Sequence, residues 1–405
     1  MGKKIDERLP QDFGLKVLPG HASVKSPWEK LYGFRETVHY SCRYDSVVSA
    51  LIMQAFRIVL PDYMERTEFM CDASHNTQLA FNPSFLEKTH THPFFRGNFT
   101  GALPADCGDE NSLMCGRVND FGSYRVEKEL DVCDWDIVGT EICRSTIYGM
   151  QGGSDACAEH FKAGPKLEFH MVEAKGCGDR HCRVVAESRE KWPMPKKPEK
   201  RNHFGPIATA DMIKFTPDED CLKEPQFFRG ECDYRFTNGT NAEYDESSMV
   251  TYPPATFIII PAIMNAIEKG VIKEKDFDHT LKCVCEASGK AMFSDFFAKE
   301  GLRNWLGVPR EIGDDDGRVL GAYIEMYIQA KHAKYEIEAF NRDEVIYVID
   351  RGVVSSGNPK YLDALIAYWY GMSKTLINAQ WALWEEDSPK DRLRLKIAKK
   401  IDKFC

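Results

Sequence analysis

The chain has 405 residues, of which 43% are hydrophobic and 28% are charged, and its formal net charge is −9. This balance is typical of a globular protein of two or three domains and excludes a disordered or fibrous chain. An acidic chain lacks the clustered Lys and Arg that sequence-independent binding to nucleic acid requires. We therefore expect small molecules or proteins as partners, and no nucleic acid.

The beginning of the chain, residues 1–8, lacks the apolar core of a signal peptide, and the longest apolar stretch, 257–263, is far shorter than a bilayer span. We expect a cytoplasmic protein that does not enter a membrane. In that compartment the 14 cysteines stay reduced. They are then more readily interpreted as metal ligands, core residues or nucleophiles than as a disulfide framework.

Along the chain, apolar spacing first predicts a helix over 44–60. His90 and His92 follow, and on an extended segment both imidazoles point to one face, as two metal ligands or an acid/base pair require. Arg96 nearby can clamp a carboxylate or an enolate. These three residues are catalytic candidates, and histidines hydrogen-bonded to loop backbone are the alternative.

The next segment has the order strand, helix, hairpin. Residues 122–137 alternate like a strand, 139–162 have helical spacing, and 166–174 with 182–187 are typical of paired strands. Asp134 shares one strand face with Asp136, and two carboxylates held together can raise the pKa of one for general base catalysis. Asp134 is thus a further catalytic candidate, and a helix cap is the alternative.

A glycine-rich turn in this predicted hairpin holds Glu173, Cys177 and Cys182 within ten residues. Such a turn can direct both thiolates to one point, and Zn²⁺ accepts sulfur and oxygen ligands together in a tetrahedron. Cys157, on the helix upstream, is the nearest thiol that can complete the set. The alternatives are small buried cysteines and a disulfide across the turn.

Residues 189–202 are rich in proline and lysine, break both helix and strand periodicity, and predict a linker. Beyond them, 334–350 contain strand patterns, 359–380 form a long aromatic-rich helical pattern, and 381–385 with 392–397 suggest a hairpin. The order strand, helix, hairpin therefore recurs in the second half.

Moving the second half back by about 213 positions places Glu386 on Glu173 and the helical pattern 257–269 on 44–60. We infer a tandem duplication: an α+β protein of two pseudo-repeated modules, residues 1–188 and 203–405, each a mainly antiparallel sheet with helices packed on one side. Similar supersecondary units can also arise independently. No cysteine lies between Cys285 and Cys405, so a zinc site would belong to the first module.

Two further patterns favour structural roles. Asp314-Asp-Asp316-Gly317 resembles part of a calcium loop but lacks its later glutamate, so we expect a helix cap. A dense aromatic set is expected in the core, although such rings can also line an apolar pocket. Its members are Tyr361, Trp369, Tyr370, Trp381 and Trp384.

Through Val172-Glu173, Gly178-Asp179 and Cys182-Arg183-Val184-Val185, residues 131–188 resemble the four-vinyl-reductase domain, a small-aromatic-sensing, zinc-binding domain of phenol- and xylene-responsive activators. The resemblance implies zinc beside an apolar pocket, with Cys157, Glu173 and Cys182 near the family's ligands and Cys177 substituting from inside the turn. Those sensors form dimers, which implies a homodimer here. The sensors also carry an ATPase, but this chain has no Gly-x4-Gly-Lys-[Ser/Thr], which argues against a transcription activator.

Cys133-Asp-Trp-Asp together with Gly-Asp-x-x-Cys is also similar to the L-2-amino-thiazoline-4-carboxylic acid hydrolase family, whose members open a small heterocycle. We therefore expect a cytosolic enzyme, a hydrolase that acts on a small ring, with zinc in the first module. If all four ligands bind, the zinc is structural and catalysis falls to His90, His92, Arg96 or Asp134. The alternatives are a non-catalytic sensor or carrier of a small aromatic, and an iron–sulfur protein, for which a standard cluster spacing is missing.

Overall fold

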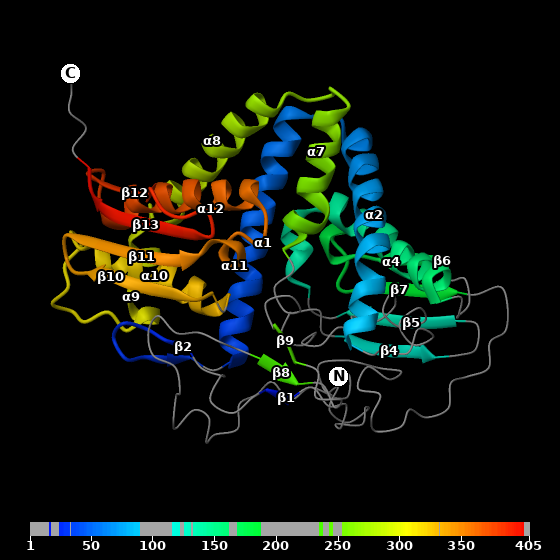
Figure 1. Ribbon diagram of the computed structural model, residues 1–405, viewed down its shortest axis with the longest axis horizontal. Helices are drawn as coiled ribbons and strands as arrows, with labels where there is room; N and C mark the ends of the chain where they lie inside the picture. The colour runs from blue at the N-terminus through cyan, green and yellow to red at the C-terminus, as the bar shows by residue number, and fades with distance from the viewer. Residues whose placement is uncertain are drawn as a thin grey trace.

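The computed structural model describes residues 16–17, 24–32, 34–89, 116–121, 125–130, 133–161, 168–187, 235–237, 243–245, 253–331 and 333–400. Long helices stand between two four-stranded antiparallel sheets (Figure 1), so the predicted α+β class is confirmed. The predicted linker, 189–202, lies outside the described residues. Among the helices described, none is long and apolar enough to cross a membrane.

The described part of the first half contains two long helices, a sheet, and a third long helix that lies between the second and third strands of the sheet along the chain. The long helices are α1 (Phe34–Val59) and α2 (Tyr63–Thr89). The sheet has the spatial order β4-β5-β7-β6, with β4 at Gly116–Phe121, β5 at Arg125–Leu130, β6 at Glu168–Glu173 and β7 at Cys182–Glu187. Between β5 and β6 lie a 3-10 helix, η3 (Asp134–Val138), and α4 (Thr140–Phe161), and a 3-10 turn, η4 (Lys175–Cys177), joins β6 to β7.

The second half has more helices before its sheet. They are a π-helical turn η6 (Ala255–Ile259), α7 (Ile260–Glu268), α8 (Glu274–Met292), α9 (Phe296–Leu306) and α10 (Gly317–Ala330). The sheet has the order β10-β11-β13-β12, with β10 at Tyr335–Phe340, β11 at Glu344–Asp350, β12 at Trp381–Glu386 and β13 at Arg392–Lys399. Between β11 and β12 lie α11 (Arg351–Val354), α12 (Pro359–Met372) and a π-helical turn η7 (Ser373–Ile377).

Two smaller sheets are built from short strands, and one of them joins distant parts of the chain. One pairs β1 (Lys16–Val17) with β8 (Arg235–Thr237), which in turn pairs with β9 (Glu243–Asp245). The other pairs β2 (Val24–Lys25) with β3 (Leu31–Tyr32).

The two halves are interlocked through their first helices. In Figure 1, α1 stands beside α7 between the two large sheets. α1 packs against α8, α10 and α12 of the second half, while α7 and η6 pack against α2 of the first half. One hydrophobic cluster consequently runs from Val48 on α1 to Ile142 on α4 and Leu395 on β13. Because apolar burial supplies most of the folding free energy, the halves stabilise one another.

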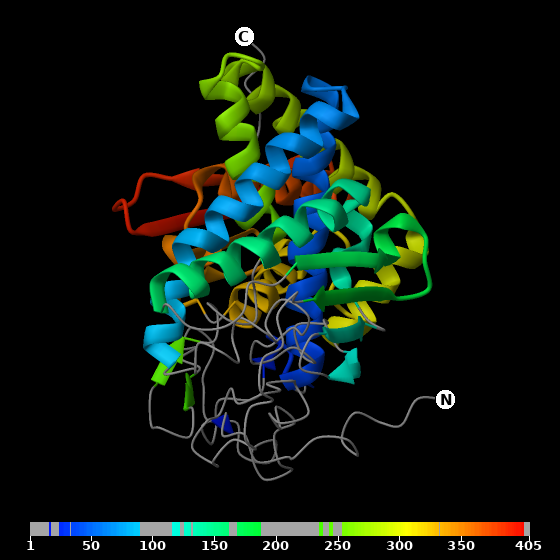
Figure 2. The same cartoon turned by 90° about the vertical axis from the view of Figure 1, so that its right-hand side faces the viewer.

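Close helix crossings fix the helices that cover the sheets. Gly371 of α12 and Gly289 of α8 face each other. A Cβ on Gly371 would lie 2.2 Å from the Glu286 carbonyl oxygen, and a Cβ on Gly289 would lie 2.1 Å from the Tyr368 carbonyl oxygen. α2 and α4 run side by side across the face seen in Figure 2. There a Cβ on Gly152 would lie 2.3 Å from the His75 carbonyl oxygen. Glycine permits these backbone contacts because it has no side chain.

The second sheet has one apolar and one charged face. Tyr347 and Leu395 are directly paired, both fully buried, and lie on the face toward the helices. On the opposite face, Arg394 contacts Glu338 and Glu386. Successive strand residues alternate between faces, so this separation follows from the alternating sequence of β13.

Several predicted elements are confirmed with altered ends. The helix expected over 139–162 is α4, and both hairpins lie where their patterns indicated. The strand expected over 122–137 was too long, because Asp134 already begins the 3-10 helix. The helix expected over 359–380 changes to π-helical geometry at Ser373. There the Ser373 hydroxyl and the Lys374 ammonium both donate to the Trp381 carbonyl at the start of β12. Asp316 caps α10 as expected, accepting from the Arg318 amide.

Candidate functional site

The β6–β7 hairpin holds the cysteine-rich turn. The turn bends through η4, and Gly178 has φ +100°, a conformation that favours glycine. The Cys177 and Gly178 amides donate to the carbonyls of Ala174 and Lys175, both at 2.9 Å. The Asp179 carboxylate accepts from the Ala174 amide at 2.8 Å and closes the turn. The hydrogen bonds within the turn therefore stabilise its conformation.

Cys182, at the start of β7, lies buried beneath this turn. Its Sγ accepts a hydrogen bond from the Lys175 amide at 3.3 Å, and the Cys133 thiol is hydrogen-bonded to it. The bond from Cys133 outweighs burial and, with the Lys175 amide, lowers the pKa of Cys182 to about 7. The same bond, with burial, raises the pKa of Cys133 well above its ordinary value.

Cys143, in the first turns of α4, lies against the same hairpin. A Cβ on Gly176 would lie 2.5 Å from the Cys143 sulfur, and the Gly176 amide is hydrogen-bonded to that sulfur. Burial raises the pKa of Cys143 to about 12, and the nearby Cys182 and Cys177 sulfurs add to the effect. The Cys177 side chain, in the turn of the hairpin, is exposed to solvent. We call Cys133, Cys143, Cys177 and Cys182 the thiol cluster.

A buried carboxylate fixes the helix that carries Cys143. Glu141 accepts from Arg57 Nε at 3.1 Å and Nη2 at 2.8 Å, and from Arg66 Nη2 at 3.0 Å. Burial opposes ionisation of Glu141, but these hydrogen bonds outweigh it and lower its pKa to about 2. Gly139 has φ +116°, and a Cβ there would lie 2.3 Å from Arg57 Nη2. The start of α4 is thereby tied to both α1 and α2.

The structure separates Glu173 from the predicted zinc ligand Cys182. Glu173 pairs with Arg183 in the sheet, so it shares the face of Arg183, whereas the adjacent Cys182 points to the opposite face. Glu173 Oε2 lies 2.5 Å from His181 Nε2 and 3.6 Å from Arg183 Nε. The backbone of Cys157 belongs to α4, but its side chain lies outside the description. Of the predicted set, the hairpin brings only Cys177 and Cys182 to the thiol cluster.

The second sheet explains the position of Glu173. Glu386 pairs with Arg394 across β12 and β13, as Glu173 pairs with Arg183 across β6 and β7. Each glutamate also contacts that arginine. Because no described cysteine accompanies the second pair, we assign the Glu–Arg contact to the framework of each sheet.

Within the described residues, no three His, Cys, Asp or Glu side chains are placed so that they could hold a metal ion as they stand. Sequence reasoning overlooked Cys133 and Cys143 as partners of the hairpin cysteines because both lie well upstream of the hairpin. One usable signal was present, since Cys133 lies in the segment 122–137, which was expected to be a strand of the same module as the hairpin.

The predicted catalytic residues are not assembled in the described part of the structure. His90, His92 and Arg96 lie outside the described residues. Asp134 begins η3, but its side chain is likewise not described. Its neighbour Asp136 lies 3.4 Å from Arg43 Nη1 at the surface.

A second polar cluster is buried between α1, α10 and α12. Lys331 Nζ donates to Asp45 Oδ2 at 2.8 Å and to Ser356 Oγ at 3.2 Å. Tyr327 and Tyr361 donate their hydroxyls to Asp45 Oδ1 at 2.9 and 2.6 Å. Burial and then the Asp45 charge raise the pKa of both tyrosines well above the ordinary value.

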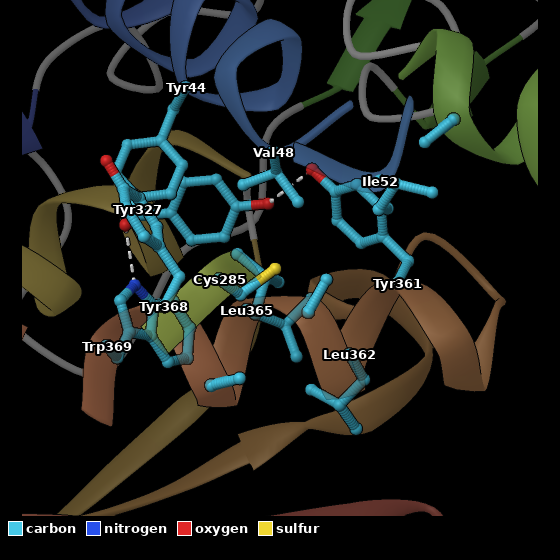
Figure 3. Close-up of a cluster of buried hydrophobic side chains, with 14 of the residues drawn as sticks. Tyr44, Val48, Ile52, Cys285, Tyr327, Tyr361, Leu362, Leu365, Tyr368 and Trp369 are labelled. Atoms are coloured by element: carbon cyan, nitrogen blue, oxygen red, sulfur yellow. Dashed lines mark hydrogen bonds between the residues drawn. The ribbon is translucent and has the colours of Figure 1, made fainter. Parts of the chain in front are cut away.

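Aromatic rings pack against Tyr327 of this cluster, and Figure 3 shows two of them, Tyr44 and Trp369. The Trp369 indole donates to the Tyr44 hydroxyl at 2.6 Å. Tyr361, Trp369 and Trp381 are fully buried, as expected for the core. The other two members of the aromatic set, Tyr370 and Trp384, are only partly buried.

No family model, no curated protein and no solved structure matches this chain.

Proposed function

We propose that the chain is an enzyme that hydrolyses or otherwise opens a small cyclic compound, and that the thiol cluster binds zinc in its first half. The observation that carries the metal proposal is that Cys133 and Cys143, from the segment before the sheet's third strand, lie beside Cys177 and Cys182 of the β6–β7 hairpin. The ring-opening reaction rests on the family resemblance of residues 131–188.

The donor chemistry of the thiol cluster fits zinc. Thiolates are among the preferred ligands of Zn²⁺. The amides of Lys175 and Gly176 donate to the Cys182 and Cys143 sulfurs, and such hydrogen bonds favour the thiolate form. We assign the ligands to Cys133, Cys143, Cys177 and Cys182. Glu173 is left out because it lies on the other face of the sheet from Cys182, and Cys157 because its side chain lies outside the description. Zinc binding then requires the four sulfurs to move toward one another.

Zinc that retains an open position supplies a Lewis acid for a carbonyl or a ring heteroatom. The residues around the thiol cluster would position that site. Glu141, Arg57 and Arg66 hold α4, while the Lys175 and Gly176 amides orient the sulfurs. If all four cysteines bind, zinc instead ties the hairpin to α4, and the chemistry belongs to other residues.

Metal analysis of anaerobically purified full-length protein tests the zinc proposal. We expect one zinc per chain in the wild type and its loss in Cys143→Ser and Cys182→Ser. Cys283→Ser is the matched control, because this exposed thiol lies on α8 of the second half, with its sulfur 3.8 Å from His279 Nε2. Wild-type protein without zinc, or variants that retain it, would contradict the proposal.

Incubation with 2-aminothiazoline-4-carboxylate, followed by chromatography and mass spectrometry, tests the reaction. An enzyme consumes the compound with the gain of one water. A sensor or carrier, the alternative, binds a small ring compound and returns it unchanged.

We also infer that the two halves arose by tandem duplication. Both large sheets have the same strand order, and in each a helix connects the second strand to the third. α2 packs on α4 as α8 packs on α12. The first two strands of each sheet contain one register shift, at Val118/Asp120 and at Ile337/Ala339. A crystal structure in which the two sheets and their helix pairs did not superpose would contradict this inference.

A further inference from the structure

We infer that the thiol cluster is a redox site in which Cys133 and Cys182 join as a disulfide, with the exposed Cys177 as the first thiol to meet the oxidant. The oxidant that we name is a low-molecular-weight disulfide. The inference concerns the sulfur atoms alone and therefore does not depend on the zinc proposal.

The backbone already brings the half-buried Cys133 and the buried Cys182 together. Leu130 of β5 pairs directly with Cys182 of β7, and Cys133 follows Leu130 by three residues. The Cys133 thiol is hydrogen-bonded to the Cys182 sulfur. A disulfide requires neighbouring Cα atoms and side chains that point toward each other. Both segments therefore need only small adjustments to become linked.

The position of Cys177 supplies a route for the oxidant. Cys182 is only 3% exposed, so a soluble disulfide cannot reach its sulfur directly. Cys177 is exposed and belongs to the same hairpin, five residues before Cys182. Thiol–disulfide exchange proceeds by successive attack of thiolates on sulfur, so an exposed thiol can pass the bond inward.

The exchange balances in three steps. The Cys177 thiolate attacks the small disulfide, which forms a mixed disulfide and releases one small thiolate. Cys182 attacks the Cys177 sulfur and releases the second small thiolate, which leaves a Cys177–Cys182 disulfide. Cys133 then loses its proton, attacks the Cys182 sulfur and returns Cys177 as a thiol. Overall, two protein thiols are oxidised and one small disulfide is reduced to two thiols.

The disulfide would lock the end of β5 to the start of β7. It would also remove two of the sulfur atoms that we assign to zinc, so bound zinc would be released on oxidation. Disulfides in reducing compartments are usually transient and redox-sensing, and this neighbouring pair with an exposed entry thiol fits that role.

The test uses full-length protein, freed of metal by a chelator under anaerobic conditions and then equilibrated with mixtures of reduced and oxidised glutathione. Free thiols are alkylated, and the disulfides are mapped by peptide mass spectrometry. We expect Cys133–Cys182 as the main linkage between the described cysteines. Glutathione on the exposed Cys283 shows that the oxidant has acted.

Two variants separate the steps. Cys133→Ser is expected to abolish the buried linkage and to accumulate the Cys177–Cys182 disulfide. Cys177→Ser is expected to form the Cys133–Cys182 linkage at least about tenfold more slowly, because the entry thiol is gone. Circular dichroism checks that both variants fold.

The inference is overturned if Cys283 carries glutathione while Cys133 and Cys182 remain free thiols, or if they link only in urea. An unchanged rate in Cys177→Ser overturns the entry route. Because the protein is metal-free, these results do not depend on zinc binding. A parallel oxidation of zinc-loaded protein, followed with a zinc indicator, reports whether metal is released.

Discussion

The ammonium nitrogen of Lys331 lies 2.8 Å from Oδ2 of Asp45, although 286 residues separate them in the sequence. Both side chains are almost completely buried. Asp45 belongs to α1 of the first half, and Lys331 ends α10 of the second half. The pair therefore marks the place where the first helix of the chain is held inside the second half.

Lys331→Met should lower the free energy of unfolding by roughly 3–5 kcal/mol, because it leaves the buried Asp45 carboxylate without its cation. The double variant Asp45→Asn/Lys331→Met should recover part of the loss, since asparagine still accepts from Tyr327 and Tyr361. Urea unfolding followed by tryptophan fluorescence measures both. Lys282→Met, at a surface pair with Glu286, is the control and should change stability by less than about 1 kcal/mol. An equally small effect at Lys331 would show that the pair does not hold α1.

Gly371→Ala should destabilise the protein by several kcal/mol, because its Cβ would lie 2.2 Å from the Glu286 carbonyl oxygen where α12 crosses α8. Gly301→Ala is the matched control. It changes a helical glycine of α9 with open space around it, and should stabilise by about 0.5–1 kcal/mol through helix propensity. Thermal unfolding of both variants decides the matter, and a Gly371→Ala protein as stable as the wild type would disprove this close crossing.

Glu141 should make stability depend on acid pH. Burial alone would raise its pKa, but hydrogen bonds from Arg57 and Arg66 outweigh burial and lower it from 4.5 to about 2. The folded state therefore holds this carboxylate ionised, and the stabilisation is fully present above pH 4.5 and is lost as the pH falls toward 2. Its size is on the order of 3 kcal/mol.

Glu141→Gln is the variant that isolates this effect. The difference in unfolding free energy between wild type and Glu141→Gln should be constant at neutral pH and shrink steadily below pH 4.5. Urea titrations at successive pH values measure it. A difference that does not change with pH would mean that Glu141 acts through packing and not through its charge.

Cys283 and Cys285 should react very differently with iodoacetamide, although they are two residues apart on α8. Cys283 is exposed, whereas Cys285 is fully buried, and burial raises its pKa to about 12. Alkylation of native protein near pH 8, followed by peptide mass spectrometry, should modify Cys283 at least about tenfold faster. In urea the two rates should converge. Equal rates in the native protein would place Cys285 at the surface.

The hairpin near Cys182 could be predicted from the sequence because its information is local. Glycine at position 178, alternating residues on either side and polar residues between them specify two strands and a turn. The prediction that Glu173 and Cys182 bind one metal required more than local information. It depended on which face of the sheet each side chain occupies, and the register shift between Met171 and Glu173 places Glu173 opposite Arg183.

By itself, the sequence determined the α+β class, the two hairpins, the cap at Asp316 and the core placement of Trp369, because these follow from local periodicity, capping chemistry and apolar character. Only the tertiary structure decided that Cys133 meets Cys182 and that Asp45 meets Lys331. These contacts join segments far apart in the chain. Helix crossing and strand register set their geometry, and neither leaves a periodic pattern in the residues concerned.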